Sequence, residues 1–147
     1  MAEGTGQDTP KGTPRPAHVF PIRVYYEDTD AGGVVYHANY LRFAERARTE
    51  MLRAAGLDHA GLMAGEGLAF IVRRCAVDFV RPARLDDALE VHTRVLSASG
   101  ARIEAEQIVR RTGDDIARLT LEIACVDREG RPQRLPGRIS AAISPSS

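Results

Sequence analysis

The chain has 147 residues, 44% of them hydrophobic, which suits one domain with one buried core. Its 20 acidic and 20 basic residues are interspersed, so composition predicts no surface for nucleic acid. No apolar run approaches the roughly 20 residues of a membrane span, and the N-terminus lacks the apolar core of a secretory signal. We therefore expect a cytoplasmic protein without membrane insertion.

Residues 1–17 are rich in Gly, Thr and Pro, which predicts a disordered N-terminal tail. The folded domain is expected to span residues 18–139. From Phe20 to Glu27 the side chains alternate with the period of a strand that buries one face. Pro21, near the start of this strand, favours an edge position because proline cannot donate a backbone hydrogen bond.

After an Asp- and Gly-containing loop, residues 37–55 carry apolar side chains at spacings of three and four. This pattern predicts one long helix with a broad apolar stripe. Gly56 is well placed to end the helix in the left-handed conformation, and Asp58 to cap a second short helix over residues 58–65.

The rest of the chain has strand patterns, separated by short Gly-containing turns that are typical of antiparallel hairpins. The predicted strands cover residues 68–80, 89–95, 103–109 and 116–126, and we predict that they form a four-strand meander. A sheet that curls around the helix would bury its stripe, so the predicted fold class is α+β. Pairing of an open sheet edge with a second copy would protect that edge. Residues 140–147 are predicted to form a frayed C-terminal tail.

Two cysteines lie far apart inside apolar strand patterns, at Cys75 and Cys125. They show no metal-ligand spacing, so we interpret them as small buried apolar residues rather than a disulfide or a metal site. Lys11 is the only lysine and lies in the predicted tail, which argues against lysine chemistry at an active site.

Asp28 and Asp30 follow an apolar strand, as in phosphatases that form an aspartyl phosphate. That chemistry needs a downstream lysine and a parallel sheet, and the pattern here predicts neither. A calcium loop is also disfavoured, because Gly32 and Asn39 stand where an EF-hand has ligands. We interpret Asp28 and its neighbour Glu27 as solvated loop acids or local caps of the turn.

A carboxylate just before a helix offers a base or nucleophile beside unpaired backbone N–H groups. Gly32 and Gly33 let the backbone pass close to a ligand at the helix start. A thioester suits such a site: the N–H groups polarise its oxygen while the carboxylate attacks its carbon or activates water.

The same segment carries a longer motif. Its residues are Arg23-Val24, Thr29-Asp30, Gly33-Val34-Val35 and Ala38-Asn39-Tyr40, followed by the stretches Glu45–Arg53, Ala69–Arg73 and Pro82–Asp87. This pattern resembles the 4-hydroxybenzoyl-CoA thioesterase family of hotdog-fold enzymes. It is more closely similar to the bacterial acyl-CoA thioesterases associated with the Tol-Pal envelope system. The resemblance covers about residues 20–136.

The resemblance implies a hotdog fold and hydrolysis of acyl-CoA without a metal or redox cofactor. It places Asp30 as nucleophile or general base, and His37 where a backbone N–H polarises the thioester oxygen. The 4-hydroxybenzoyl branch has an aromatic residue at the latter position and the Tol-Pal branch has histidine, so the imidazole is a second candidate donor. Gly33 and Tyr36 are expected to contact substrate. An alternative for Tyr36, as for Phe43, is a place in the core.

The resemblance also implies a site at the subunit interface of a homodimer or homotetramer, with acyl-CoA or an acyl-carrier protein as the thioester carrier. Two other functions stay open, a hotdog dehydratase and a non-catalytic acyl-carrier or envelope-complex binding module. The other histidines have no partner pattern and are interpreted as structural or exposed; they are His18, His59 and His92. The candidates for binding the CoA phosphates are Arg73, Arg74, Arg81 and Arg84.

Overall fold

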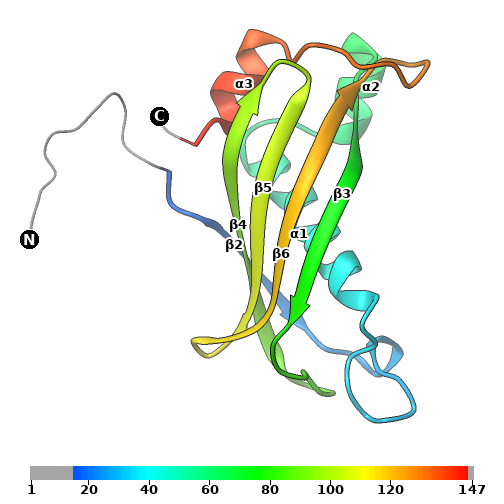
Figure 1. The fold of residues 1–147 in the computed structure, drawn as a ribbon, viewed down its shortest axis with the longest axis vertical. Helices are drawn as coiled ribbons and strands as arrows, with labels where there is room; N and C mark the ends of the chain where they lie inside the picture. The colour runs from blue at the N-terminus through cyan, green and yellow to red at the C-terminus, as the bar shows by residue number, and fades with distance from the viewer. Residues whose placement is uncertain (1–14, 146–147) are drawn as a thin grey trace, which may run out of the picture.

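The computed structural model describes residues 15–145, which form an antiparallel sheet wrapped around a long helix (Figure 1). The strands are β2 (His18–Arg23), β3 (Ala69–Phe79), β4 (Ala88–Ser99), β5 (Arg102–Arg111) and β6 (Asp114–Val126). The helices are α1 (Asn39–Ala54), α2 (His59–Glu66) and α3 (Gly137–Ile143), with a short 3-10 helix, η1 (Tyr26–Asp28). The predicted α+β fold class is confirmed.

The strand order across the sheet is β2-β4-β5-β6-β3. Strands β4, β5 and β6 form consecutive hairpins as predicted, and Thr112 and Gly113 have φ angles of 52° and 90°, the combination of a type I′ turn. Strand β2 lies at an edge, as Pro21 indicated.

The predicted four-strand meander was wrong for β3, which pairs with β6 at the opposite edge rather than with β4. Its connection to β4, residues 80–87, crosses the end of the sheet instead of folding into a tight hairpin. There the connection bonds to the segment before α1, through the Val35 N–H and the Ala83 carbonyl at 2.8 Å.

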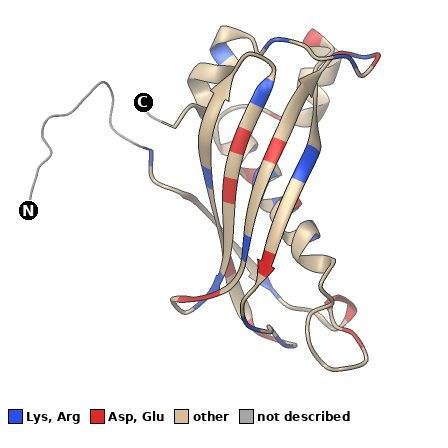
Figure 2. Ribbon diagram, in the orientation of Figure 1, with Lys and Arg blue, Asp and Glu red and all other residues tan. Residues whose placement is uncertain are grey.

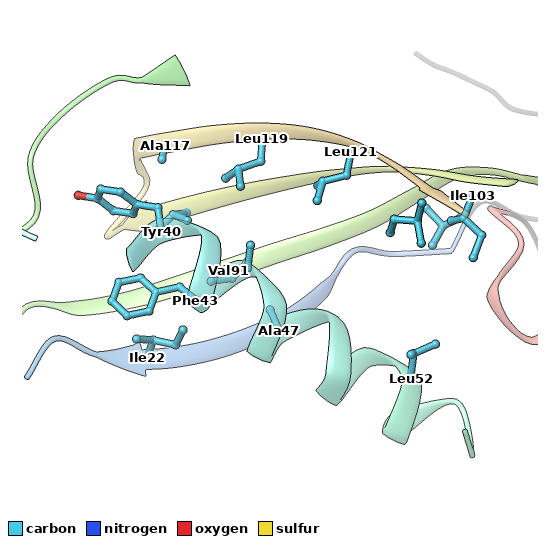
Figure 3. Packing of buried hydrophobic residues seen from close by; sticks show 14 of the residues in the cluster. Ile22, Tyr40, Phe43, Ala47, Leu52, Val91, Ile103, Ala117, Leu119 and Leu121 are labelled. Atoms are coloured by element: carbon cyan, nitrogen blue, oxygen red, sulfur yellow. The ribbon is translucent and has the colours of Figure 1, made fainter. Parts of the chain in front are cut away.

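Helix α1 lies along the inner face of the sheet and begins slightly later than expected, at Asn39. The first part of its apolar stripe is buried as predicted, at Tyr40, Phe43, Ala44 and Ala47. The predicted last part was wrong: Met51 is only partly buried, Ala54 and Ala55 are exposed, and Leu52 is buried instead. Figure 3 shows Tyr40 and Phe43, near the start of α1, at the same end of the core as Val91 and Leu119 of the sheet. Full burial of a side chain such as Phe43 stabilises the fold by about 1.5–3 kcal/mol, so α1 is the centre of the core. Gly56 has the expected positive φ, 83°.

The predicted cap of α2 is also present: an Asp58 carboxylate oxygen accepts a hydrogen bond from the Gly61 N–H at 2.5 Å. This bond satisfies one of the backbone donors that a helix start leaves unpaired.

The expectation of a frayed tail over residues 140–147 was wrong in part, because residues 140–143 belong to helix α3. Ile139 and Ile143, four positions apart, lie on one helix face and are 0% and 5% exposed. The Arg15 N–H donates to the Pro145 carbonyl at 2.9 Å, so residues 15–17 of the predicted N-terminal tail have a fixed place beside the chain end. The rest of that tail lies outside the described residues.

Both cysteines are free, Cys125 fully buried and Cys75 partly so. Burial raises the pKa of each thiol, which favours the protonated form. Figure 2 shows acidic and basic residues alternating over the sheet rather than gathering by sign. None of the described helices combines the length and apolar character needed to cross a bilayer.

Candidate functional site

The loop between β2 and α1 is tied to the β3–β4 connection. The Val24 N–H donates to the Asp87 carbonyl at 3.0 Å, and the Asp86 N–H donates to the Val24 carbonyl at 2.9 Å. With the bond between Val35 and Ala83, these contacts hold both segments at the same end of the sheet. The start of α1 is therefore fixed by residues far away in sequence.

Asp28 is the buried acid of this loop, 4% exposed. One of its oxygens accepts from the Tyr25 N–H at 2.8 Å and the other from the Asn39 Nδ2 at 2.7 Å. Its carbonyl accepts from the Tyr36 N–H at 2.9 Å. The interpretation of Asp28 as a local cap is confirmed and its reading as a solvated acid was wrong, whereas Glu27 is exposed.

Asp30 is exposed and lies in a tight turn. Its N–H donates to the Val34 carbonyl at 2.9 Å, and its carbonyl accepts from the Gly33 N–H at 3.0 Å. Its Oδ1 accepts from the Gly32 N–H at 2.8 Å, while Oδ2 accepts no hydrogen bond from any described residue. One carboxylate oxygen is thus oriented by the turn and the other is available to water or a ligand.

The two glycines have separate roles in this turn. Gly33 has a φ of 81°, a conformation that a side chain disfavours. A Cβ on Gly32 would lie 3.2 Å from Asp30 Oδ1, closer than usual contacts. The absence of a side chain at Gly32 is therefore what lets its N–H approach the carboxylate.

His37 is exposed and precedes α1. Its ring lies 4.6 Å from the Tyr36 ring and meets the Phe79 ring edge-on at 6.1 Å. The backbone N–H groups of His37 and Ala38 donate to no acceptor within residues 15–145, whereas the next N–H, of Asn39, donates to the Tyr36 carbonyl at 2.8 Å. The helix start therefore offers two adjacent donors.

A shallow pocket of about 250 Å³ lies beside His37. Tyr40 and Phe79 form its aromatic wall, with ring centroids 5.8 Å apart, and Arg81 stands at its rim. Tyr36 is 46% exposed next to it, while Phe43 is fully buried and belongs to the core. Asp30 and Gly33 lie outside this pocket, so the single chain does not enclose the whole set of predicted site residues.

The wall of this pocket is held by a buried hydroxyl. The Tyr40 hydroxyl accepts from the Ala83 N–H at 3.2 Å, and burial raises the pKa of this hydroxyl, which keeps it protonated.

Asp87 lies in the same β3–β4 connection as Ala83. Burial raises the pKa of its carboxyl, but the Arg84 N–H and the Arg111 guanidinium outweigh this effect, so the pKa is lowered overall. The Asp87–Arg111 distance is 2.7 Å.

Of the four arginines considered for CoA phosphates, Arg81 is the one that lines the described pocket beside His37. Arg73 instead pairs with Glu122 at 2.9 Å on the sheet.

The described residues bring together no group of three or more His, Cys, Asp or Glu side chains suited to a metal ion.

The remaining histidines lie away from this loop. His92 faces Glu90 at 3.0 Å, His59 meets the Phe70 ring edge-on, and His18 has a buried Nδ1 without a hydrogen-bond partner among the described residues.

Sequence reasoning missed the Asp28–Asn39 hydrogen bond that anchors the site. A polar residue at the predicted start of the apolar stripe was the available signal for it.

The comparisons with known proteins identify the family. The model of the thioesterase-like superfamily matches residues 24–143. The acyl-CoA thioesterase YbgC of Haemophilus influenzae is 48% identical over 84% of this chain and 92% of its own length. The acyl-CoA thioester hydrolase YbgC of Escherichia coli is 47% identical over 83% of this chain and 92% of its own.

Solved structures place the fold in the same group. A probable thioesterase from Bartonella henselae superimposes with a TM-score of 0.79 at 44% identity, over 82% of this chain and 99% of its own. A 1,4-dihydroxy-2-naphthoyl-CoA thioesterase from Synechocystis gives a TM-score of 0.80 at 25% identity, over 86% of this chain and 95% of its own. The chain has the hotdog fold and belongs to the thioesterase-like superfamily.

Proposed function

We propose that this protein is an acyl-CoA thioester hydrolase in which Asp30 and the start of α1 act on the thioester group. The observation that carries the proposal is the Asp30–His37 loop. Among the described residues, one Asp30 carboxylate oxygen has no hydrogen-bond donor and the N–H groups of His37 and Ala38 have no acceptor. The named activity of the two YbgC relatives supports the same reaction.

Two routes fit an exposed carboxylate beside these donors. As a nucleophile, Asp30 bonds to the thioester carbon, the CoA thiolate leaves and is protonated, and water hydrolyses the resulting anhydride. As a general base, Asp30 takes a proton from a water whose oxygen attacks the same carbon. In both routes the carbonyl oxygen becomes negative, and the His37 N–H stabilises it.

The proposal includes a homodimer formed through β3. This strand is the open edge opposite β2, and its apolar side chains are poorly covered: Ile71 is 48% exposed, Val72 41% and Phe79 54%. Helix α1 packs chiefly on β2, β4 and β5, and β3 is contacted by α2 and by Tyr40 at the start of α1. A second copy would complete the sheet and cover the exposed side chains of β3.

Such a dimer would also complete the site. Antiparallel pairing of β3 with its copy brings the Phe70 end of one strand near the Phe79 end of the other. Since His37 contacts Phe79, a substrate there would also meet the partner's surface. This explains why Asp30 lies outside the pocket of a single chain.

Several finer points of the resemblance stay predictions. These are the cytoplasmic location, the association with the Tol-Pal system, a homotetramer in place of a dimer, acyl-carrier protein as an alternative carrier, and substrate contact by Gly33 and Tyr36. Each rests on the motif beginning at Arg23.

Release of free thiol from a panel of short, long and aromatic acyl-CoAs tests the function. Asp30→Asn should lower kcat about 100-fold or more, because it removes the nucleophile or base, and should leave folding and dimerisation intact. The matched control is Glu27→Gln, an exposed acid in the same loop, which should keep near-native kcat. Near-native turnover by Asp30→Asn would exclude Asp30, and no thiol release from any thioester would favour the binding-module function.

Replacing His37 separates its backbone from its imidazole. If the backbone N–H is the donor, His37→Ala and His37→Phe should change kcat less than about tenfold, because both variants keep that group. An equally large loss in both variants would assign the role to the imidazole instead. The measurement is kcat for one acyl-CoA at saturating concentration, with circular dichroism to check the fold.

A further inference from the structure

A separate cavity of about 190 Å³ lies between the C-terminal half of α1 and the inner face of the sheet. Its apolar wall consists of Met51, Leu52, Phe70, Val72, Val95, Ile103 and Ile123. Figure 3 shows Leu52 of α1 and Ile103 of β5 at this end of the core. No residue of the Asp30–His37 loop lines it.

Arg48 is the arginine that lines this cavity, and the other titratable side chains in its wall are Glu45 and His59. The Arg48 Nη1 donates to Gln107 Oε1 at 2.9 Å, and burial lowers the pKa of the guanidinium. Within residues 15–145 Arg48 forms no ion pair; Glu45, at the cavity's edge, acts on it only from a longer distance. Because a guanidinium has five N–H donors, Arg48 keeps donors for a ligand.

The position of Arg48 is fixed by a buried polar network. Gln107 is fully buried, and its Nε2 donates to the Ala44 carbonyl and to Thr93 Oγ1, both at 2.9 Å. These two bonds orient the amide so that its oxygen faces Arg48. A partly desolvated cation held in this way favours an anionic partner, since a charge in apolar surroundings is costly without one.

A second cavity adjoins this one. It has a volume of about 410 Å³, lies on the β2 side and shares Met51, Thr93, Val95 and Ile143 with the first. The two cavities are therefore neighbours, separated by side chains that include Met51 and Ile143.

We propose that this cavity binds an aliphatic chain that ends in a carboxylate, with the carboxylate on Arg48 and the chain against Met51, Phe70 and Ile123. The carboxylate has two possible sources: a free fatty acid, or the far end of a dicarboxylic acyl group whose other end is the thioester. The second source rests on the proposed function and on the proposed dimer, which brings the cavity at the Phe70 end of one β3 near the Phe79 end of the other. The first source rests on neither.

Calorimetric titration with hexanoate and hexanol tests the site without any turnover. The native protein should bind hexanoate about tenfold more tightly than hexanol, as expected for a charge-assisted hydrogen bond. Arg48→Met should abolish this preference and Arg48→Lys should keep part of it. The control is Arg46→Met, an exposed arginine of the same helix that does not line the cavity, and it should keep the full preference.

Met51→Phe, which fills the cavity, should weaken both ligands and keeps the test informative if Arg48→Met fails to fold. Equal binding of hexanoate and hexanol to the native protein overturns the proposal. An equal loss of preference in the Arg46 and Arg48 variants does so too.

Hydrolysis of adipoyl-CoA and hexanoyl-CoA distinguishes the two sources. If the carboxylate belongs to the acyl group, the ratio of the two kcat/KM values should fall about tenfold in Arg48→Met. If it belongs to a free acid, that ratio stays constant while hexanoate inhibits the native enzyme more than the variant. Hexanoate binding without thiol release from any substrate would contradict the hydrolase proposal and leave the carboxylate site standing.

Discussion

Two carboxylates of one loop, Asp28 and Asp30, have opposite environments. Asp28 is 4% exposed and both its carboxylate oxygens accept hydrogen bonds. Asp30 is exposed, and one of its carboxylate oxygens accepts no hydrogen bond from the part of the chain that the structure describes. A carboxylate whose acceptors are all occupied fixes structure, and one with a free oxygen can react. The loop thus assigns anchoring to the first acid and leaves the second for chemistry.

Removal of the anchoring acid should destabilise the fold. In Asp28→Ala the Tyr25 N–H and the Asn39 amide lose their acceptor in a buried place, so the free energy of unfolding should fall by about 2–4 kcal/mol. Urea unfolding measures this change. Glu27→Ala, which removes an exposed acid next to it, should change the same quantity by less than about 0.5 kcal/mol. Equal effects of the two substitutions would contradict the anchoring role.

At the scale of elements, the β3–β4 connection is held by an ion pair whose stability depends on pH. Asp87 accepts from Arg111 at 2.7 Å and from the Arg84 N–H at 2.8 Å, with its side chain 25% exposed. Its folded pKa lies below the ordinary 3.8, so the stabilisation is present above pH 3.8 and is lost as pH falls through the folded pKa.

Urea unfolding at neutral and at acid pH tests this pair. Asp87→Asn should lower the free energy of unfolding by about 1–2 kcal/mol at pH 7, and the difference from the native protein should shrink as pH falls well below 3.8. Asp86→Asn is the control, because the Asp86 side chain makes no ion pair with any described residue and asparagine tolerates its φ of 72°. A difference that is independent of pH would contradict an ionic contribution.

The elements also show what sequence alone can predict. The first part of the α1 stripe, the cap at Asp58 and the β4-β5-β6 hairpins depend on nearby residues, and these were predicted. The pairing of β3 with β6 joins distant segments, which local periodicity does not encode. Helix α3 buries few residues, so its pattern is too short to detect.

The same distinction holds for the candidate site. The resemblance to the thioesterase family implied the roles of Asp30 and His37, which stay predictions. The burial of Asp28 depends on Asn39, and the position of Arg48 depends on Gln107 across the core, so neither could be predicted from local sequence.

At the scale of the whole molecule, the open β3 edge leads to the prediction that activity requires a dimer. Ile71→Asp places a charge on this edge and should weaken dimerisation at least about tenfold, since it removes apolar burial and would desolvate a carboxylate. The control is Leu96→Asp. Leu96 is 47% exposed, close to the 48% of Ile71, but lies on β4, which has a neighbouring strand on both sides, so the substitution should leave the dimer intact.

Light scattering after size exclusion gives the mass of each variant, and thiol release at several protein concentrations gives its activity. If the partner chain completes the site, Ile71→Asp should lose kcat/KM at low concentration and regain it as the dimer re-forms. The native protein should keep the same activity per chain wherever it stays dimeric. A fully active monomer, of either the variant or the native chain, would show that Asp30 and His37 need no partner.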